Sequence, residues 1–234
     1  MAQQYGPKVV TDGLVLCLDA ADKNSYPGSG TTWSDLSGNN YDATLSAESI
    51  GTTTDGWMDW GSSDNANYVS IPKEALDGLS SWTLEFALYI SSTSITNGIN
   101  TLLSCGAENN FMWYLSDHSA IHTQNVPDVS LTYATSTATN FLMTVTGTGG
   151  GSGTYTGYKN GVLGSTITQN TVISVPGTFA EIALGQEYDN NTTGGFDNGQ
   201  AWLGKMGIVR FYNRVLTAAE ISQNFNAQRS RFSV

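Results

Sequence analysis

The stretch Trp-Thr-Leu-Glu-Phe-Ala-Leu-Tyr-Ile, residues 82–90, carries the strongest strand signal in the chain. Its large apolar side chains stand at every second position, as expected of a strand that turns one face toward a core. The core-facing side chains are Trp82, Leu84, Phe86, Leu88 and Ile90. The stretch therefore predicts a long strand packed on an apolar core.

Shorter stretches with strand character lie on both sides of residues 82–90. We expect about twelve strands, at a short and fairly regular spacing that is typical of a sandwich or barrel. Between two of them, Asn160-Gly161 has the sequence of a tight hairpin turn. The expected strands are residues 14–19, 41–45, 67–71, 82–90, 101–105, 111–115, 120–123, 141–146, 155–159, 162–167, 180–184 and 203–212.

Only two stretches predict helix. Residues 74–79 are expected to form a single helical turn, and residues 216–228 one longer helix. Thr217 at the N-cap, followed three residues later by Glu220, has the sequence of a capping box. The apolar face that this helix would turn toward the sandwich consists of Leu216, Ile221 and Phe225.

The chain of 234 residues is long enough to bury a core of its own as a single domain. Residues 1–12 are polar, contain Pro7 and lack a periodic pattern, which predicts an extended N-terminal arm. We expect the sandwich over residues 13–216. Residues 217–234 are expected to form a C-terminal helix and tail packed on it.

The balance of charges is strongly acidic, with 9 Lys and Arg against 20 Asp and Glu and a formal net charge of −11. Such a surface argues against nucleic acid and anionic membranes as partners, because both need clustered basic residues. Two interpretations of the arginines stay open: a local contact patch, or local compensation of the acidity. All of them lie near the C-terminus: Arg210, Arg214, Arg229 and Arg231.

Cys17 and Cys105 each lie inside an apolar run. A disulfide would require their strands to pair or to face each other, and two buried free thiols are the better prediction. Residues 1–8 contain no apolar stretch of the secretory type, and no run of about 18 apolar residues occurs. We therefore expect synthesis in the cytoplasm without a signal peptide.

Four stretches together resemble the concanavalin A-like lectin/glucanase superfamily, specifically its laminin-G-like jelly-roll domains. The resemblance extends from about Gly13 to Ala227 and implies a two-sheet antiparallel jelly-roll sandwich, all-β, with one short C-terminal helix. The most specific stretch is the closing strand and helix that begin at Gly204. The four stretches are Gly13-Leu-Val-Leu-Cys-Leu-Asp-Ala, Trp33-Ser-Asp-Leu-Ser-Gly-Asn-Asn, Trp82-Thr-Leu-Glu-Phe with the later hairpin Tyr158-Lys-Asn-Gly, and Gly204-Lys-Met-Gly-Ile-Val-Arg-Phe-Tyr-Asn-Arg-Val-Leu-Thr-Ala-Ala-Glu-Ile.

The first and last of these stretches are also similar to segments of structural proteins of tailed bacteriophages. This similarity implies a virion protein on the particle surface, either a head decoration or a peripheral tail component, with capsid or tail proteins as partners. A virion protein assembles in the host cytoplasm, which agrees with the missing signal. The residues expected to contact partners, in the arm and the tail, are Tyr5, Pro7, Arg229, Arg231 and Phe232.

A carbohydrate-binding adhesin or receptor-binding domain, assisted by calcium and directed at host surface polysaccharide, is the alternative function. A glycan hydrolase is more remote. Glucanases of the superfamily use a Glu-x-Asp-x-x-Glu strand that places two carboxylates in one cleft. Residues 82–90 carry one carboxylate, Glu85, with Ala87 and Tyr89 at the next positions of its face. The pattern therefore predicts a protein that is not an enzyme.

Two aromatic clusters have the composition of a glycan-binding surface, in which exposed rings are flanked by polar side chains. One is Trp57-Met-Asp-Trp60, with Asp59 between its tryptophans, and the other contains Trp113 and Tyr114. The alternative is that a sandwich core takes up these rings, as we expect for Trp82 and Trp202.

Two loops carry oxygen ligands that would suit calcium, which many laminin-G-like domains bind. For Asp35 and Asn39 in the first loop, the alternative is that they cap turns through the backbone. His118 and His122, with Asp117 nearby, would either hold a metal or be solvated. The calcium candidates are Asp19, Asp22, Asp35 and Asn39 in the first loop, and Asp189, Asn190 and Asp197 in the second.

Overall fold

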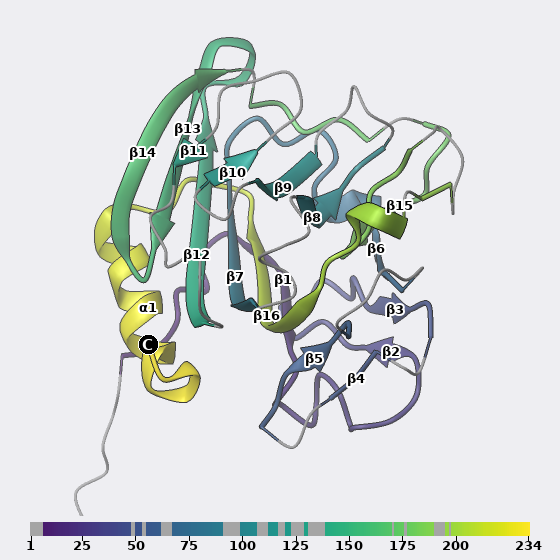
Figure 1. The fold of residues 1–234 in the computed structure, drawn as a ribbon. Coiled ribbons are helices and arrows are strands. Elements are labelled where there is room, and N and C mark those ends of the chain that lie inside the picture. The colour runs from purple at the N-terminus through teal and green to yellow at the C-terminus, as the bar shows by residue number, and fades with distance from the viewer. Residues whose placement is uncertain are drawn as a thin grey trace, which may run out of the picture.

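The computed structural model describes most of the chain. It covers residues 7–47, 50–52, 55–61, 67–90, 99–106, 112–116, 120–122, 129–130, 139–169, 171–175, 177–189, 195–196 and 198–234. For residues 52, 99, 112–116, 120–122, 129–130, 169 and 198 it describes the backbone alone. These residues form two antiparallel sheets packed face to face, with one α-helix along the outside (Figure 1).

The helix-side sheet, so named because α1 packs on its outer face, has the strand order β14-β13-β12-β7-β16-β5-β4, with β1 also paired to β16. The strand β7 lies between β12 and β16, so the predicted strand at residues 82–90 has a central place. The strands of this sheet are β1 (Leu14–Asp19), β4 (Gly51–Thr52), β5 (Met58–Asp59), β7 (Trp82–Ile90), β12 (Thr139–Thr148), β13 (Gly153–Lys159), β14 (Val162–Gln169) and β16 (Gly204–Tyr212).

The opposite sheet has the order β11-β10-β9-β8-β15-β6-β3-β2. Each sheet also joins strands from distant parts of the sequence, such as β7 with β16 and β6 with β15, as in a jelly roll, and the strand pairs among the described residues run antiparallel. The strands of this sheet are β2 (Thr32–Trp33), β3 (Ala43–Leu45), β6 (Val69–Pro72), β8 (Ile99–Ser104), β9 (Met112–Ser116), β10 (Ala120–His122), β11 (Val129–Ser130) and β15 (Glu181–Leu184).

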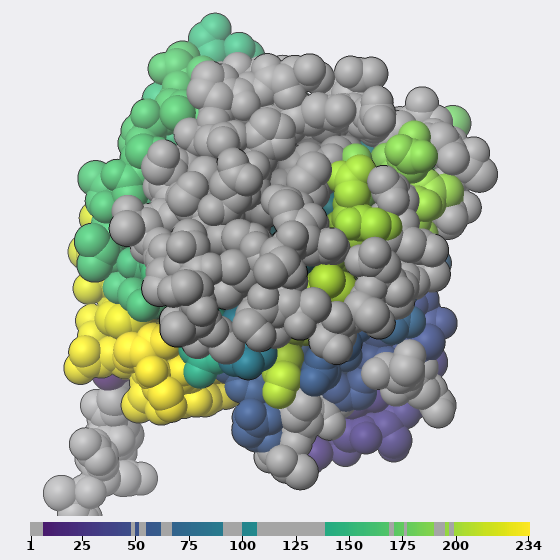
Figure 2. Space-filling view, viewed as in Figure 1, coloured from purple at the N-terminus to yellow at the C-terminus, as the bar shows by residue number. Residues whose placement is uncertain are grey.

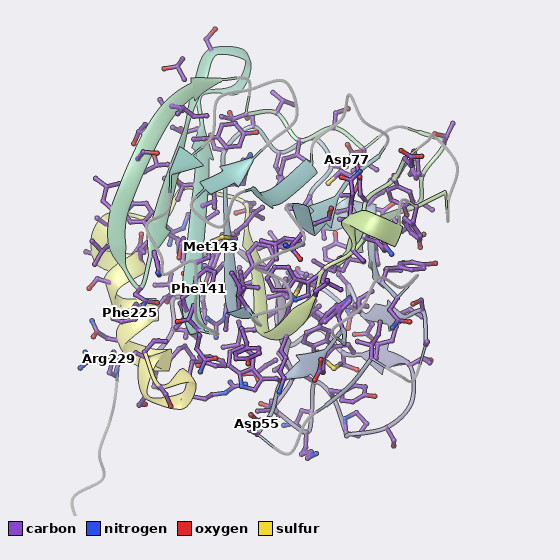
Figure 3. All side chains as sticks on the ribbon, viewed as in Figure 1. Asp55, Asp77, Phe141, Met143, Phe225 and Arg229 are labelled. Atoms are coloured by element: carbon purple, nitrogen blue, oxygen red, sulfur yellow. The ribbon has the colours of Figure 1, made fainter. Side chains whose placement is uncertain are left out.

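The core between the sheets is rich in large aromatic side chains. The alternating apolar positions of β7 are all buried, which confirms the predicted core face of this strand. Phe141 and Met143 of β12 also lie inside the sandwich (Figure 3). Cys17 and Cys105 are buried free thiols in the structure, as predicted. The four tryptophans that are most fully buried are Trp33, Trp60, Trp82 and Trp202.

The helix α1 (Ala218–Phe232) is longer than the predicted 216–228. Thr217 is its N-cap, and the capping box with Glu220 is complete. Arg214 donates to Glu220 at 2.7 Å, and this bond, with the backbone of Thr217, lowers the pKa of Glu220 to about 2. Within the described residues, no helix has the length and apolar character needed to cross a bilayer.

The predicted C-terminal tail is wrong in part, because residues 229–232 continue the helix. Phe232 is buried, and its ring packs on Trp57 with the centroids 4.8 Å apart. Arg231 forms a two-bond ion pair with Asp19 at 2.6 Å. Arg229 is exposed on the outer side of α1 (Figure 3). Of the expected tail contacts, only Arg229 is therefore available to a partner.

Residues 7–12 form no regular structure, as predicted, but they pack against the sandwich and α1. Lys8 accepts a hydrogen bond through its carbonyl from the Gln223 side chain at 2.6 Å, and Val10 is buried. Pro7 is exposed, and Tyr5 lies outside the described residues. The part of the expected arm that includes Lys8 and Val10 is therefore packed on the folded domain.

The hairpin at Asn160-Gly161 is confirmed, with positive φ values of 51° and 74° that fit a type I′ turn. Several very short strands were not predicted, because two residues are too few to show a periodic pattern: β2, β4, β5 and β11. The helical turn expected at 74–79 is a 3₁₀-helix at Lys73–Ala75.

Candidate functional site

The carboxylate of Glu85 lies beneath α1, within a buried polar network. Glu85 is 6% exposed, and Arg210 on the neighbouring strand approaches its Oε2 to 3.6 Å. The side-chain amide of Asn224 donates to both carboxylate oxygens, at 3.0 and 2.9 Å. Burial raises the pKa of Glu85, and the charge of Arg210 opposes that rise. Glu85 presents no surface to a substrate.

The same network joins the N-terminal segment to the C-terminal helix. Asn224 Oδ1 accepts from the backbone N–H of Val10 at 2.8 Å. The Tyr212 hydroxyl donates to the Val10 carbonyl at 3.1 Å and lies 3.1 Å from Asn224 Nδ2. Because these groups are buried and bonded to one another, the network acts as an anchor for α1.

The arginines largely balance acidic groups of the same chain. Arg210 pairs with Glu85, Arg214 with Asp12 and Glu220, and Arg231 with Asp19. Local compensation of the acidity therefore describes three of the four arginines, and the expected basic contact patch is reduced to Arg229.

The expected exposed tryptophan pair is wrong, because Trp57 and Trp60 are 5% and 1% exposed. Trp57 packs on Phe232, and Trp60 belongs to the main core. Asp59 accepts from the Gly61 N–H at 2.9 Å and lies 3.8 Å from the Lys205 amine. Both rings are buried in the sandwich because a tryptophan side chain has a large apolar area, and removing that area from water stabilises the fold.

The second predicted aromatic cluster lies at the limit of what the structure describes. Trp113 and Tyr114 belong to β9, and the structure describes their backbone alone. His122 ends β10, also with its backbone alone, and Asp117 and His118 lie outside the described residues. The glycan and metal hypotheses for these residues stay predictions.

In the first loop Asp35 caps a turn, which is the alternative that the sequence left open. Its Oδ1 accepts from the N–H groups of Cys17 and Ser37, at 2.9 and 2.8 Å. Its Oδ2 accepts from the Ser37 hydroxyl at 2.7 Å and the Tyr41 N–H at 3.2 Å. Four donors saturate this carboxylate, so it has no free lone pair to offer a calcium ion.

The remaining candidates of the first loop are also engaged within the chain. The Asn39 amide donates to the Val15 carbonyl at 2.9 Å, so it fastens the turn to β1. Asp22 accepts from the backbone and the side chain of Asn24, both at 2.9 Å. Asp19 holds Arg231. These contacts do not fit a calcium cage built on this loop.

In the second loop Asp189 is exposed, and Asn190 and Asp197 lie outside the described residues. The backbone of the loop closes on itself, since Asp189 N–H donates to the Gly195 carbonyl at 2.8 Å. Among the described residues, no group of three or more His, Cys, Asp or Glu side chains is placed to hold a metal ion.

A row of aromatic side chains, here called the aromatic ladder, lies along β6, β15 and the base of the second loop. Tyr68 packs on Phe196 with centroids 4.7 Å apart, and Phe196 packs on Tyr188 at 4.8 Å. Phe179 follows at 4.6 Å from Tyr188. Phe179 and Tyr188 are buried, whereas Tyr68 and Phe196 are half-buried. The ladder therefore begins in the core and ends at the surface.

Glu181 of β15 lies beside the ladder. Its Oε1 accepts from the Tyr188 hydroxyl at 3.0 Å, and its Oε2 accepts from the Ser70 hydroxyl. Burial and the charge of Glu181 together raise the pKa of both Tyr68 and Tyr188, so these phenols stay protonated near neutral pH. A carboxylate can accept about four hydrogen bonds, so Glu181 keeps acceptor capacity for a ligand hydroxyl.

Sequence reasoning did not find this group, because its members come from separate parts of the chain. Tyr68 directly precedes β6, Glu181 begins β15, and Phe196 follows a Gly/Asn-rich stretch. The pairing of β6 with β15 and the bridge between Tyr188 and Phe196 bring them together. The one sequence signal is the richness of the loop at 189–197 in polar residues, which includes the calcium candidates Asp189, Asn190 and Asp197.

Comparison with known proteins identifies the family of the chain. The model of the concanavalin A-like lectin/glucanases superfamily matches residues 63–222. The chain belongs to this superfamily. The matched range includes the aromatic ladder, the strand β7 and the capping box of α1. A search of curated protein sequences gave no match.

Solved structures of several other proteins have a fold similar to that of this chain. A sialidase of Trypanosoma rangeli is 16% identical with a TM-score of 0.65, over 98% of this chain and 35% of the sialidase chain. The binding domain of botulinum neurotoxin serotype D is 15% identical with a TM-score of 0.66, over 94% and 53% of the two chains. The receptor-binding domain of the botulinum neurotoxin C/D mosaic serotype is 16% identical with a TM-score of 0.63, over 94% of this chain and 52% of the other. The chain thus spans about a third to a half of these proteins.

Proposed function

We propose that the chain is a non-catalytic carbohydrate-binding domain displayed on the surface of a tailed-phage particle. The observation that carries the binding role is the half-buried pair Tyr68 and Phe196 beside the carboxylate of Glu181. Aromatic faces accept the C–H face of a sugar ring, and a carboxylate fixes its hydroxyls. The fold of the lectin and glucanase superfamily supports the same role.

The chemistry of the site favours a neutral glycan. Glu181 contributes a negative charge beside the rings, in a chain whose formal net charge is −11. A sialylated or sulfated sugar would be repelled by this field, whereas a neutral hexose polymer would not. On a phage particle, the natural ligand of this class is the polysaccharide on the surface of a host bacterium.

Two features support a non-catalytic role. Glycosidases of the retaining type place two carboxyl groups about 5–5.5 Å apart in an accessible cleft. The β7 strand carries one carboxylate, Glu85, which is buried beneath α1 and paired with Arg210. Binding without turnover is also what a protein that holds a particle to a cell surface requires.

Replacing Tyr68 with alanine is expected to weaken binding to a neutral bacterial polysaccharide at least about tenfold. The change removes half of the surface aromatic pair. Tyr89→Ala is the matched control, because Tyr89 is also half-buried but lies on the helix-side sheet with Lys205 over its ring. Binding is measured by calorimetry after selection of the ligand on an array of bacterial and algal glycans.

Equal losses of glycan affinity in the Tyr68→Ala and Tyr89→Ala variants would show that the aromatic ladder is not the binding site. A second variant, Glu181→Gln, separates the roles within it: the amide keeps the packing but removes the charge. We expect it to weaken neutral ligands modestly and to relieve the exclusion of acidic ones. Array binding repeated with calcium and with chelator tests the remaining calcium proposal, which now rests on the loop at Asp189.

The place on a phage particle is supported by the similarity of the first and last stretches to phage structural proteins. Deleting residues 1–6 keeps Lys8 and Val10 with their bonds to Gln223, Asn224 and Tyr212, so we expect the variant to fold and yet fail to incorporate into particles. Deleting residues 1–12 would also remove Val10 and its bonds to Asn224 and Tyr212. Melting temperature and particle incorporation, measured by mass spectrometry of purified virions, distinguish the two variants. Normal incorporation of the shorter deletion would eliminate the arm as an attachment point.

A further inference from the structure

The carboxylate of Glu181 accepts one hydroxyl on each of its two oxygens. The Tyr188 hydroxyl donates to Oε1 at 3.0 Å, and the Ser70 hydroxyl donates to Oε2. A carboxylate oxygen has two lone pairs, so each oxygen keeps one acceptor site after these bonds. The two sites that remain to Glu181 are therefore divided between its oxygens, one on each.

The strands β6 and β15 place this carboxylate on the outer face of the opposite sheet. Val69 and Ile71 of β6 are buried in the core, whereas Ser70 between them is half-buried and points to the outer face. Ser70 pairs with Ala183, and Glu181 lies two residues before Ala183, on the same face of β15. Glu181 is itself half-buried. Figure 2 shows yellow-green atoms, the colour of the chain near β15, at the surface of the molecule.

The aromatic ladder places two half-buried rings beside this carboxylate. Tyr68 lies two residues before Ser70, on the same face, and its ring packs on Phe196 with centroids 4.7 Å apart. Phe196 packs in turn on Tyr188, the residue that donates to Glu181, at 4.8 Å. A sugar ring that stacks on Tyr68 and Phe196 therefore lies near the two acceptor sites of Glu181.

Within the part of the chain that the structure describes, no basic side chain pairs with Glu181. A carboxylate without a cation accepts hydrogen bonds more strongly than a neutral oxygen does. A ligand hydroxyl therefore gains more from Glu181 than from the serine and tyrosine hydroxyls around it. The ion pairs of the described residues involve other carboxylates, those of Asp12, Asp19, Asp59, Glu85 and Glu220.

We propose that Glu181 recognises two hydroxyl groups on neighbouring ring carbons, a vicinal diol, on an internal residue of a neutral polysaccharide. This inference rests on the proposed glycan-binding function and names the group that the site selects. Each hydroxyl of the diol donates to one carboxylate oxygen, while Tyr68 and Phe196 contact a sugar ring. The diol is internal because a long polysaccharide has many internal residues and few ends.

Two neutral hexamers of β-linked glucose test this selectivity, because they have the same composition and differ in linkage. The internal residues of cellohexaose, which is β-1,4-linked, have free hydroxyls on the second and third carbons. In laminarihexaose, which is β-1,3-linked, the third carbon carries the linkage, so the internal residues have no vicinal diol. We expect the wild type to bind laminarihexaose at least about tenfold more weakly, since one hydrogen bond to a charged group is lost.

Variants assign the preference to the carboxylate and its holder. Glu181→Ala should bind both hexamers with similar weak affinities, because stacking on the rings does not depend on the linkage. Ser70→Ala should reduce the preference, and Ser70→Thr, which keeps a hydroxyl, should retain it. Thr168→Ala is the control, because it removes an exposed hydroxyl from β14 of the other sheet. Circular dichroism verifies the fold of each variant, and the comparison of the two hexamers on the wild type needs no variant.

The polysaccharide selected on the glycan array gives a second test, which decides if neither hexamer binds. Periodate cleaves the bond between the two carbons of a vicinal diol, so we expect oxidation to abolish binding. Unchanged binding after oxidation would overturn the inference. Equal affinities for the hexamers, with binding that depends on Tyr68, would also overturn it and yet leave the proposed function in place. If no glycan binds in a Tyr68-dependent manner, the proposed function fails and this inference fails with it.

A guanidinium group is the other donor that meets both oxygens of a carboxylate, and it also stacks on aromatic rings. N-acetylarginine amide is therefore measured beside the sugars. Tighter binding of this probe than of any glycan, lost in Glu181→Ala, would show that the site takes a cationic group and not a diol.

Discussion

Replacing Arg210 with methionine is expected to lower the free energy of unfolding by about 3–5 kcal/mol, because it leaves the buried carboxylate of Glu85 without its cation. The loss should depend on pH in a defined direction. Without Arg210, burial raises the pKa of Glu85 further, and the folded protein must take up a proton or carry an uncompensated charge. Urea unfolding at about pH 5 and about pH 8 measures both effects.

The direction of this pH dependence follows from the linkage between protonation of Glu85 and folding. A carboxyl group whose pKa is raised by folding stabilises the fold below its unfolded pKa of about 4.5, and this stabilisation is lost as the pH rises through the folded pKa. The deficit of the variant against wild type should therefore be smaller at pH 5 than at pH 8. The double variant Glu85→Leu, Arg210→Met is the control and should recover most of the stability. A deficit that is equal at both pH values would contradict the assigned pairing.

Replacing Gly185 with alanine is expected to cost about 3 kcal/mol or more. Gly185 has a φ of 79°, and a Cβ at this position would overlap the indole of Trp60. Both the backbone conformation and the close approach therefore require glycine. Gly185 also bonds through its backbone to Leu102 and Trp202, at 2.9 and 3.0 Å, directly before the segment that carries Tyr188. Thermal unfolding followed by near-ultraviolet circular dichroism, which reports on the packed tryptophans, measures the effect.

The matched control is Gly177→Ala. A Cβ at Gly177 meets no atom within 4 Å, and its φ lies outside the left-handed region. Its melting temperature should stay close to that of the wild type or rise slightly, since alanine restricts the unfolded chain. If both glycine variants melted alike, the close packing of Gly185 on Trp60 would not be a determinant of stability.

The parts of the fold that could be predicted are those in which local sequence and burial agree. The period-two pattern of β7 gave its bounds and its core face, because nine residues are enough to show the alternation. The capping box predicted the start of α1, since Thr217 and Glu220 satisfy each other without help from the sandwich. The end of α1 was predicted four residues too early, because its last turn is fixed by Phe232 packing on Trp57.

The candidate site could not be predicted, for a physical reason that its residues share. The local sequence around a tryptophan in a turn-rich stretch does not indicate whether the ring is buried in the core or binds a ligand. In the folded chain Trp57 and Trp60 are buried. Tyr68 and Phe196 stand in weak local patterns, and their contact depends on strand pairing over more than a hundred residues. Resemblance supplied the fold but no information about which aromatic face reaches the surface.

The bond between Val10 and Asn224 joins residues 214 positions apart. It places the beginning of the described chain against its last helix, on the α1 side, while the aromatic ladder lies toward the opposite flank (Figure 1). The segment around Val10 and the helix α1 therefore lie on the same side of the molecule. An attachment made on the α1 side of the domain would therefore leave the proposed glycan-binding site uncovered.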